Sequence, residues 1–302
     1  MVAGRLSKLA VAVVALSLVS GACTDSDEFS DDEFSDGGGT TGSPGSRDGQ
    51  ECDEEVLGAD ELTTFSVAHY VVDGRLGEVC LGEESDVLLD AWSKLADIAP
   101  PGQLGDLGLF GGFASGEHPD DVSLAFVTSI DDDGTLFSMS VNLEEADRDP
   151  DELLLTMAHE FAHVFTGIST QVDRSSEAID SCSTFYNGEG CYESDALVFQ
   201  WIQRFWGGGL IDEIDVDVEP TADDGQERCE LHPGFFGSYA ASSPEEDFAE
   251  SFSAFVFGLE ADSAAQQEKL DWIAEQAGLV EFRDRAESAG YLSLPNNFDR
   301  CG

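Results

Sequence analysis

The chain has 302 residues and a formal net charge of −50, with 63 acidic residues against 13 Lys and Arg. A surface with this excess repels nucleic acids and anionic membranes, so composition argues against both as direct partners. Hydrophobic residues make up 41% of the chain, enough for one good-sized domain with its own core. We interpret the high net charge as an adaptation to a salty medium, in which counterions screen the repulsion between acidic residues. An acidic surface that binds basic substrates is the less favoured explanation.

Residues 1–22 have the layout of an export signal. Two basic residues precede an apolar run over 9–19, which is too short to span a bilayer as a mature helix. Cys23 follows, as in a bacterial lipoprotein signal, although Ser20 replaces the Leu, Val or Ile usual three residues before the cysteine. An ordinary N-terminal helix is the alternative. We expect a signal peptide, lipidation at Cys23 and a membrane lipoprotein, or a secreted protein if Cys23 stays unmodified.

Residues 23–50 are expected to form a disordered tether. The segment Asp-Glu-Phe-Ser-Asp occurs twice in succession, at 27–31 and 32–36, and a Gly/Ser/Thr-rich stretch follows. Acidic and Gly/Ser-rich runs stay solvated and extended. The folded domain is therefore expected over residues 51–302.

Six cysteines remain after Cys23, and an even number in an exported protein predicts disulfides. Six cysteines allow fifteen connectivities, so composition alone leaves the pairing open. The short loop between Cys182 and Cys191 favours a bond between its ends. The simplest complete set is sequential: Cys52–Cys80, Cys182–Cys191 and Cys229–Cys301.

The first part of the domain has the pattern of a helix followed by strands. Residues 86–98 carry apolar side chains on one face and predict a helix that ends before a pair of prolines. A glycine-rich loop is expected from 102 to 116. Strands are expected at 122–130 and 135–143, joined by a hairpin turn over Asp131–Gly134. The aspartates of that turn lack the twelve-residue ligand pattern of a calcium loop.

The second part of the domain is helical. Asp149 can cap a long helix that has Pro150 at its first position and ends at Gly167. Further helices are expected at 193–206, 244–258, 264–277 and 279–289. A small sheet followed by several helices indicates the α+β class.

The long helix contains the run His159-Glu160-Phe161-Ala162-His163, an H-E-x-x-H pattern. Residues four apart share a helix face, so both imidazoles can reach one metal ion. Glu160 lies beside them and could take a proton from a metal-bound water, whose pKa zinc lowers. The alternative is an accidental histidine pair on a surface face. The flanking apolar residues argue against it, because two His and a Glu are costly to bury without a shared role.

A hydrolytic zinc site needs a third protein ligand. The metzincin continuation fails, because Thr166 and Ser169 stand where Gly and the third His would be. The remaining histidines have no clear helical frame: His69, His118 and His232. Glu246 and Glu250 are four apart in a predicted helix, so both can face the metal helix. The alternative for Glu246 is a capping partner of Ser243, and for Glu250 a solvated face.

These two motifs, H-E-F-A-H and Y-x-x-x-x-x-x-E-x-F-A-E, resemble the catalytic domain of anthrax lethal factor and related gluzincin metallopeptidases. The resemblance spans roughly residues 150–260. It implies a zincin-like fold with a small sheet, an active-site helix and a mostly helical C-terminal part. It also implies Zn²⁺ held by His159, His163 and Glu246, with Glu160 as general base.

The resemblance assigns one further residue. Tyr239, seven residues before Glu246, corresponds to a tyrosine that assists the reaction, and its phenol could donate a hydrogen bond to a developing oxyanion. A buried structural tyrosine is the alternative. From its position four residues after Glu246, and not from the resemblance, Glu250 would accept a hydrogen bond from a ligand histidine.

The resulting hypothesis is an exported, lipid-anchored zinc peptidase that acts on peptide or protein substrates. A catalytically silent zinc-binding surface or adhesion lipoprotein is the second hypothesis, and a structural envelope lipoprotein without metal is the third. All the expected catalytic positions are filled, which favours activity.

Overall fold

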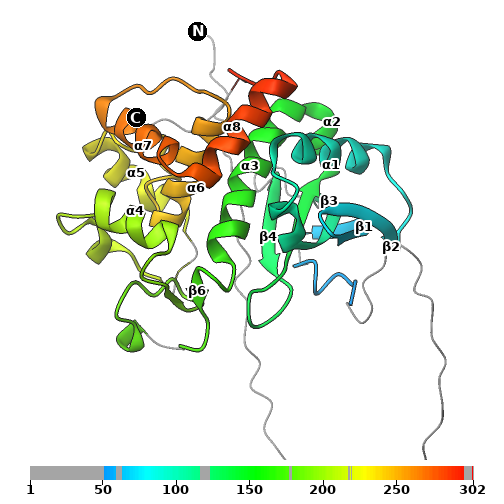
Figure 1. Ribbon diagram of the computed structural model, residues 1–302, viewed down its shortest axis with the longest axis horizontal. Coiled ribbons are helices and arrows are strands. Elements are labelled where there is room, and N and C mark those ends of the chain that lie inside the picture. Colours follow the sequence, from blue (N-terminus) through cyan, green and yellow to red (C-terminus); the bar gives the residue numbers. More distant parts are fainter. Residues whose placement is uncertain are drawn as a thin grey trace, which may run out of the picture.

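The computed structural model describes residues 51–58, 63–115, 123–176, 179–216, 218, 220–295 and 301. The expected signal, Cys23 and the tether lie outside the described residues, as does His118. The described part has a five-stranded sheet and α1 (Asp86–Ile98) on one side, α3 (Pro150–Gly167) through the middle, and α4 (Leu197–Phe205) to α7 (Ala264–Ala274) on the other side (Figure 1). Helix α8 (Ala277–Ala289) crosses toward α1. The predicted α+β class is confirmed.

The sheet has the strand order β2-β1-β3-β5-β4, so β2 and β4 are its edges. The β3–β5 pair is parallel and the other pairs are antiparallel. The turn predicted between β4 and β5 is present, with Gly134 at φ 65°. The backbone N–H of Thr135 closes it by donating to Asp131 Oδ1 at 2.7 Å. The strands are β1 (Thr63–Val72), β2 (Arg75–Gly82), β3 (Leu107–Ser115), β4 (Ala125–Ser129) and β5 (Phe137–Asn142).

The glycine-rich loop predicted for 102–116 is wrong, because most of it forms the central strand β3. Gly111 and Gly112 serve close packing there instead of a turn. A Cβ on Gly112 would lie 2.8 Å from Leu143 Cδ2, and a Cβ on Gly111 would lie 3.1 Å from Leu57 Cδ2. Residues without side chains therefore let neighbouring elements approach the middle of the sheet.

The predicted helices over 86–98, 150–167 and the C-terminal region are confirmed. Two polar helices were not predicted, namely α2 (Leu143–Arg148) and α5 (Ala222–Leu231). The helix predicted at 193–206 is shorter and begins at Leu197. A two-stranded ribbon joins β6 (Val172–Asp173) to β7 (Cys191–Tyr192). The helices are α1 (Asp86–Ile98), α2 (Leu143–Arg148), α3 (Pro150–Gly167), α4 (Leu197–Phe205), α5 (Ala222–Leu231), α6 (Pro244–Val256), α7 (Ala264–Ala274) and α8 (Ala277–Ala289).

The three disulfides follow the sequential pairing. Cys52–Cys80 ties the first described segment to β2, and Cys182–Cys191 closes the loop that ends at β7. Cys229–Cys301 joins α5 to residue 301. Three structural disulfides are typical of proteins outside the cytoplasm. In the described residues, no helix combines the length and apolar character needed to cross a bilayer.

A buried ion pair fixes α6 against its neighbours. Asp247 is fully buried and accepts hydrogen bonds from Trp201 Nε1 at 2.8 Å and Trp206 Nε1 at 2.9 Å. Lys269 Nζ of α7 lies 2.5 Å from Asp247 Oδ1 and 4.3 Å from the centroid of the Phe235 ring. Burial raises the pKa of Asp247 and lowers that of Lys269, and their pairing opposes both shifts. The ionised form of each residue is therefore stabilised by the charge of the other.

We predict that Lys269→Met lowers the free energy of unfolding by about 3–5 kcal/mol, since it leaves the Asp247 carboxylate buried without a cation. Lys94→Met is the matched control, because Lys94 pairs with Asp90 at 2.8 Å on the surface of α1. It should cost at most about 0.5 kcal/mol. Urea unfolding of both variants measures the difference. Equal stability of the two variants would remove the structural role given to this ion pair.

Candidate active site

Helix α3 carries the H-E-x-x-H residues into the interior. Asp149 caps it by accepting the Glu152 N–H at 3.2 Å, and Pro150 occupies the first turn. Glu160 is fully buried and His159 is 5% exposed, while His163 is partly exposed. Such groups are costly to bury unless they bind one another or a shared ligand.

Helix α6 brings the acidic motif against α3. The ring of Phe165 on α3 lies 5.1 Å from that of Phe252 and 6.2 Å from that of Phe248, centroid to centroid. Ser243 caps α6 by accepting the backbone N–H of Glu246 at 3.2 Å. The cap therefore uses the backbone of Glu246 and leaves its carboxylate for the histidines.

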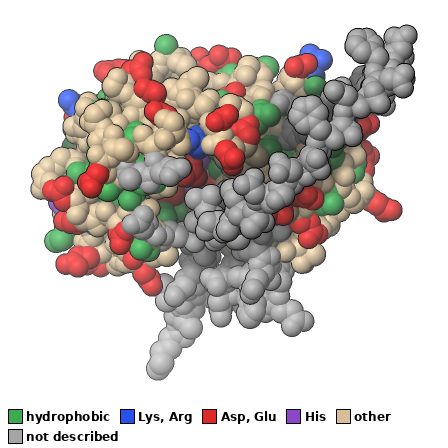
Figure 2. Space-filling view, turned by 90° about the horizontal axis from the view of Figure 1, so that it is seen from below, with side chains coloured by type: hydrophobic (Ala, Val, Ile, Leu, Met, Phe, Trp, Pro, Cys, Tyr) green, Lys and Arg blue, Asp and Glu red, His purple; other side chains and the backbone are tan. Residues whose placement is uncertain are grey.

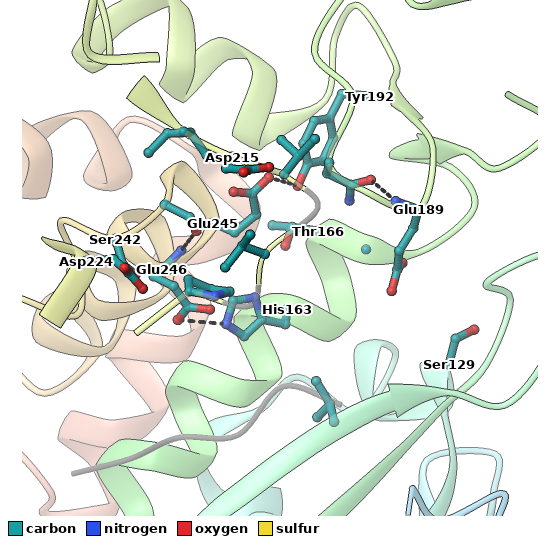
Figure 3. Close-up of a pocket in the computed structure, with 18 of the residues that line it drawn as sticks. Ser129, His163, Thr166, Glu189, Tyr192, Asp215, Asp224, Ser242, Glu245 and Glu246 are labelled. Carbon is teal, nitrogen blue, oxygen red and sulfur yellow. Dashed lines mark hydrogen bonds and ion pairs between the residues drawn. The ribbon is translucent and has the colours of Figure 1, made fainter. Parts of the chain in front are cut away.

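The side chains of His159, His163 and Glu246 converge. Glu246 Oε2 lies 2.9 Å from His159 Nε2. It lies 3.4 Å from His163 Nε2, and Figure 3 shows this second pair. The two Nε2 atoms are 3.2 Å apart. One ligand atom from each residue falls within 4.8 Å of the others, so this group could hold a metal ion.

The neighbouring Glu160 supports the fit of a cation. Among the described residues, no side chain donates a hydrogen bond to its buried carboxylate oxygens, although the backbone of Val127 favours the ionised form. In the protein alone, burial raises the pKa of Glu160 to about 8, with His163 opposing and Glu246 adding to the shift. A divalent cation beside Glu160 would favour its ionised form.

The ion pairs shift the other pKa values in the same cluster. Burial alone would raise the pKa of Glu246, but the two histidines hold it well below its usual range. Burial would lower the pKa of His163, yet the Glu246 carboxylate raises it to about 9. Burial dominates at His159, whose pKa is lowered. The cluster is thus strongly polarised around the Glu246 carboxylate.

Glu245 and Glu246 point to different partners. Glu246 faces the histidines, whereas Glu245 Oε1 accepts a hydrogen bond from the Tyr192 hydroxyl at 3.1 Å (Figure 3). Successive helix residues point about 100° apart, so only one of the two can face the histidines.

Tyr239 and Glu250 also lie near the group. The ring centroid of Tyr239 is 6.0 Å from that of His159. Burial raises the pKa of Tyr239 well above its ordinary value, and the carboxylates of Glu246, Glu160 and Glu250 add to the shift. Glu250, one turn after Glu246, also counteracts the burial that lowers the pKa of Lys269. The expected hydrogen bond from Glu250 to a ligand histidine stays a prediction.

The other described histidines lie away from this group. His69 of β1 places Nδ1 3.0 Å from the carbonyl oxygen of Gly77, and His232 is exposed at the end of α5. The structure therefore brings together the residues of the two motifs and leaves these histidines apart.

A cavity of about 450 Å³ is lined by two of the three converging side chains, His163 and Glu246. His163 and Thr166 of α3 form one wall, and β4 contributes residues 127–129. The β7 region and the start of α6 form the opposite side, which includes Tyr192 and Glu245. A substrate bound in this cavity would lie against the candidate metal ligands.

The sequence interpretation missed Tyr192 and Glu245 as cavity residues. They are 53 positions apart, and their contact depends on the packing of strand β7 against the first turn of α6. The one available signal was Glu245, the first glutamate of the Pro-Glu-Glu run, which has the wrong helical phase to face the histidines together with Glu246.

Comparison with known proteins finds a distant structural similarity. No protein-family model and no curated protein matches the chain. The chain is similar to a crystal structure from Bacteroides caccae ATCC 43185, a protein proposed to be a zinc-binding metallo-peptidase. The identity is 16% and the TM-score 0.27, and the match covers 67% of this chain and 64% of that chain. Similarity at this level leaves the function to be inferred from the site.

Proposed function

We propose that this chain is an exported zinc-dependent peptidase that hydrolyses peptide bonds of peptide or protein substrates. The convergence of His159, His163 and Glu246 beside buried Glu160, at the wall of a cavity, carries the proposal. The resemblance of the two motifs to gluzincin metallopeptidases points the same way.

Zinc is the metal that this donor set favours. Two imidazole nitrogens and one carboxylate oxygen are a known ligand set of hydrolytic zinc sites, which keep a fourth position open. When bound, zinc lowers the pKa of a coordinated water to about 7 and polarises a carbonyl group.

Glu160 is the general base in this proposal. Its carboxylate would take a proton from the attacking water and then give it to the leaving amine. It is suited to this role because it is adjacent to His159 and no side chain among the described residues donates a hydrogen bond to its oxygens. Its burial also keeps the carboxylate in a fixed position.

The edge strand β4 supports a peptide as the substrate. In the described part of the chain, β4 pairs with β5 alone, and residues 127–129 line the cavity. An extended peptide can add to such an edge through backbone hydrogen bonds. A peptide bound in this way would pass alongside α3 and its H-E-x-x-H residues.

Tyr239 would donate a hydrogen bond to the oxyanion as it forms. We predict that Tyr239→Phe keeps zinc and substrate binding but lowers kcat by about 10²–10³-fold, the usual cost of losing one oxyanion donor. Steady-state kinetics and metal analysis of the same preparation test this. A kcat like that of the wild type would leave Tyr239 as a structural residue.

Glu250 would act through a ligand histidine, as second carboxylates commonly do in zinc sites. Its position one turn after Glu246, 6% exposed and close enough to influence Tyr239, supports this role. A Glu250→Ala variant with unchanged zinc affinity would remove the assignment.

The proposed placement is extracytoplasmic. Residues 1–22 would be removed as a signal peptide, Cys23 would carry the lipid, and residues 23–50 would tether a peptidase domain over 51–302. The three disulfides support an oxidising compartment. Mass spectrometry of the mature protein tests the anchor, and an intact N-terminus with unmodified Cys23 would refute it.

Casein hydrolysis with and without a chelator tests the activity. The proposal expects hydrolysis that a chelator abolishes and added zinc restores. Chelator-independent hydrolysis, or zinc-loaded protein without hydrolysis of casein or peptides, would refute it. The second result would favour a silent zinc-binding lipoprotein.

A further inference from the structure

The arginines that line the cavity are already neutralised within the protein. Arg174 Nη2 lies 2.7 Å from Glu189 Oε2, and its guanidinium also donates to the carbonyl of Gly167. Arg228 Nε lies 3.3 Å from Glu213 Oε2. Both pairs belong to the cavity lining. Neither arginine therefore offers a free positive charge to a substrate.

Glu245 differs from those paired acids. It lines the same cavity, is partly buried, and is held by the Tyr192 hydroxyl at 3.1 Å. No ion pair to Lys or Arg among the described residues includes Glu245. A partly buried carboxylate held by a neutral hydroxyl would be stabilised by an ion pair with a cation that enters the cavity.

The position of Glu245 relates it to the reacting bond. It directly precedes Glu246 in α6, and Figure 3 shows its side chain between Tyr192 and the His163–Glu246 pair. A zinc ion held at the site would be balanced by Glu246 and Glu160, which leaves the charge of Glu245 uncompensated. A side chain that reaches Glu245 would belong to a substrate residue close to the scissile bond.

The general acidity of the surface does not explain this residue. Asp and Glu are scattered over the face shown in Figure 2, where water solvates them. Glu245 instead lies in a cavity wall, where a charge is less screened. Asp215 and Asp224 line the same cavity and add to its negative potential.

We propose that the cavity selects peptides with a Lys or Arg next to the scissile bond, and that Glu245 binds this cationic side chain. The proposal rests on the peptidase function proposed above. It assigns a specificity-determining role to a residue outside the catalytic group, with Tyr192 as the residue that positions it.

The test uses matched peptides built on a casein cleavage site located by mass spectrometry, with Lys, Gln or Glu on either side of the scissile bond. Cleavage is measured with zinc-loaded wild type. Binding is measured with zinc-loaded Glu160→Gln by fluorescence anisotropy. At one of the two positions, the Lys peptide should exceed the Gln peptide by about 10-fold or more in kcat/KM and in affinity, the scale of a hydrogen bond to a charged group.

Glu245→Gln should bring the Lys-to-Gln ratio close to 1, and Glu245→Lys should invert the preference toward the Glu peptide. Tyr192→Phe should lower the ratio less, because it removes only the hydrogen bond that holds the carboxylate. Glu287→Gln removes one exposed charge from α8, outside the cavity lining, and should keep the wild-type ratio. Zinc content is checked in every variant.

Cleavage without a preference for Lys would overturn the inference and leave the peptidase function intact. The same holds if the preference survives in Glu245→Gln, or if Glu287→Gln abolishes it equally. Absence of any cleavage by zinc-loaded wild type would overturn the peptidase function, and with it this inference.

Discussion

Glu160→Gln should keep about one zinc ion per chain but hydrolyse casein about 10²-fold or more slowly than the wild type. The amide preserves the size of the side chain, and residue 160 is not one of the three converging side chains that could hold a metal ion, so metal binding should survive. It cannot take a proton from water, and general-base catalysis is worth at least this factor. Initial rates and zinc content of the same preparation measure both effects.

Asp151→Asn provides the matched control. It makes the same acid-to-amide change on an exposed residue in the first turn of α3. Its rate should stay within about two-fold of the wild type, since surface changes away from a site have small effects. If Glu160→Gln retained the wild-type rate, another group would have to be the base.

Glu246→Ala should lower zinc affinity by more than about 100-fold, because loss of a residue that only hydrogen-bonds a metal ligand already costs roughly 10–100-fold. His163→Ala should have a comparable effect. Both residues place a ligand atom in the converging group, where Glu246 Oε2 is 2.9 Å from His159 Nε2. Competition with a chromophoric chelator measures the affinity.

Glu245→Ala and His232→Ala are the controls for these variants. Glu245 turns toward Tyr192, and His232 is exposed at the end of α5, so both variants should retain zinc. If Glu245→Ala released zinc and Glu246→Ala did not, the register of α6 would be wrong. Tyr239 and Glu250 would then lose the support that spacing gives them.

The helices that form the site could be predicted because each carries its signal locally. Asp149 and Ser243 are capping residues followed by Pro, and the apolar residues after them repeat with helical period. The four-residue spacing of His159 and His163 places both on one face without knowledge of the fold.

The middle of the sheet could not be predicted in the same way. Strand β3 contains Gly108, Gly111 and Gly112, which individually suggest a loop. They belong to a strand because Leu57 and Leu143 pack closely against the glycines at 111 and 112. That reason lies in residues far away in the chain. Edge strand β2 is mostly half-buried, and its buried and exposed residues do not alternate in the regular pattern that predicts a strand.

The electrostatic surroundings of the site also depend on tertiary structure. The sequence shows Lys269 as one of very few lysines and Asp247 as one of many acids. Only the packing of α7 and of Trp201 and Trp206 around α6 makes them a buried pair. The contact between Tyr192 and Glu245 has the same origin.

The metal content of the purified full-length chain tests the central claim most directly. Protein produced with zinc available should contain about one zinc per chain, and Glu246→Ala protein made in parallel should contain much less. Inductively coupled plasma mass spectrometry after extensive dialysis gives both values. A wild-type chain without zinc, or one whose zinc content is unchanged by Glu246→Ala, would contradict the account.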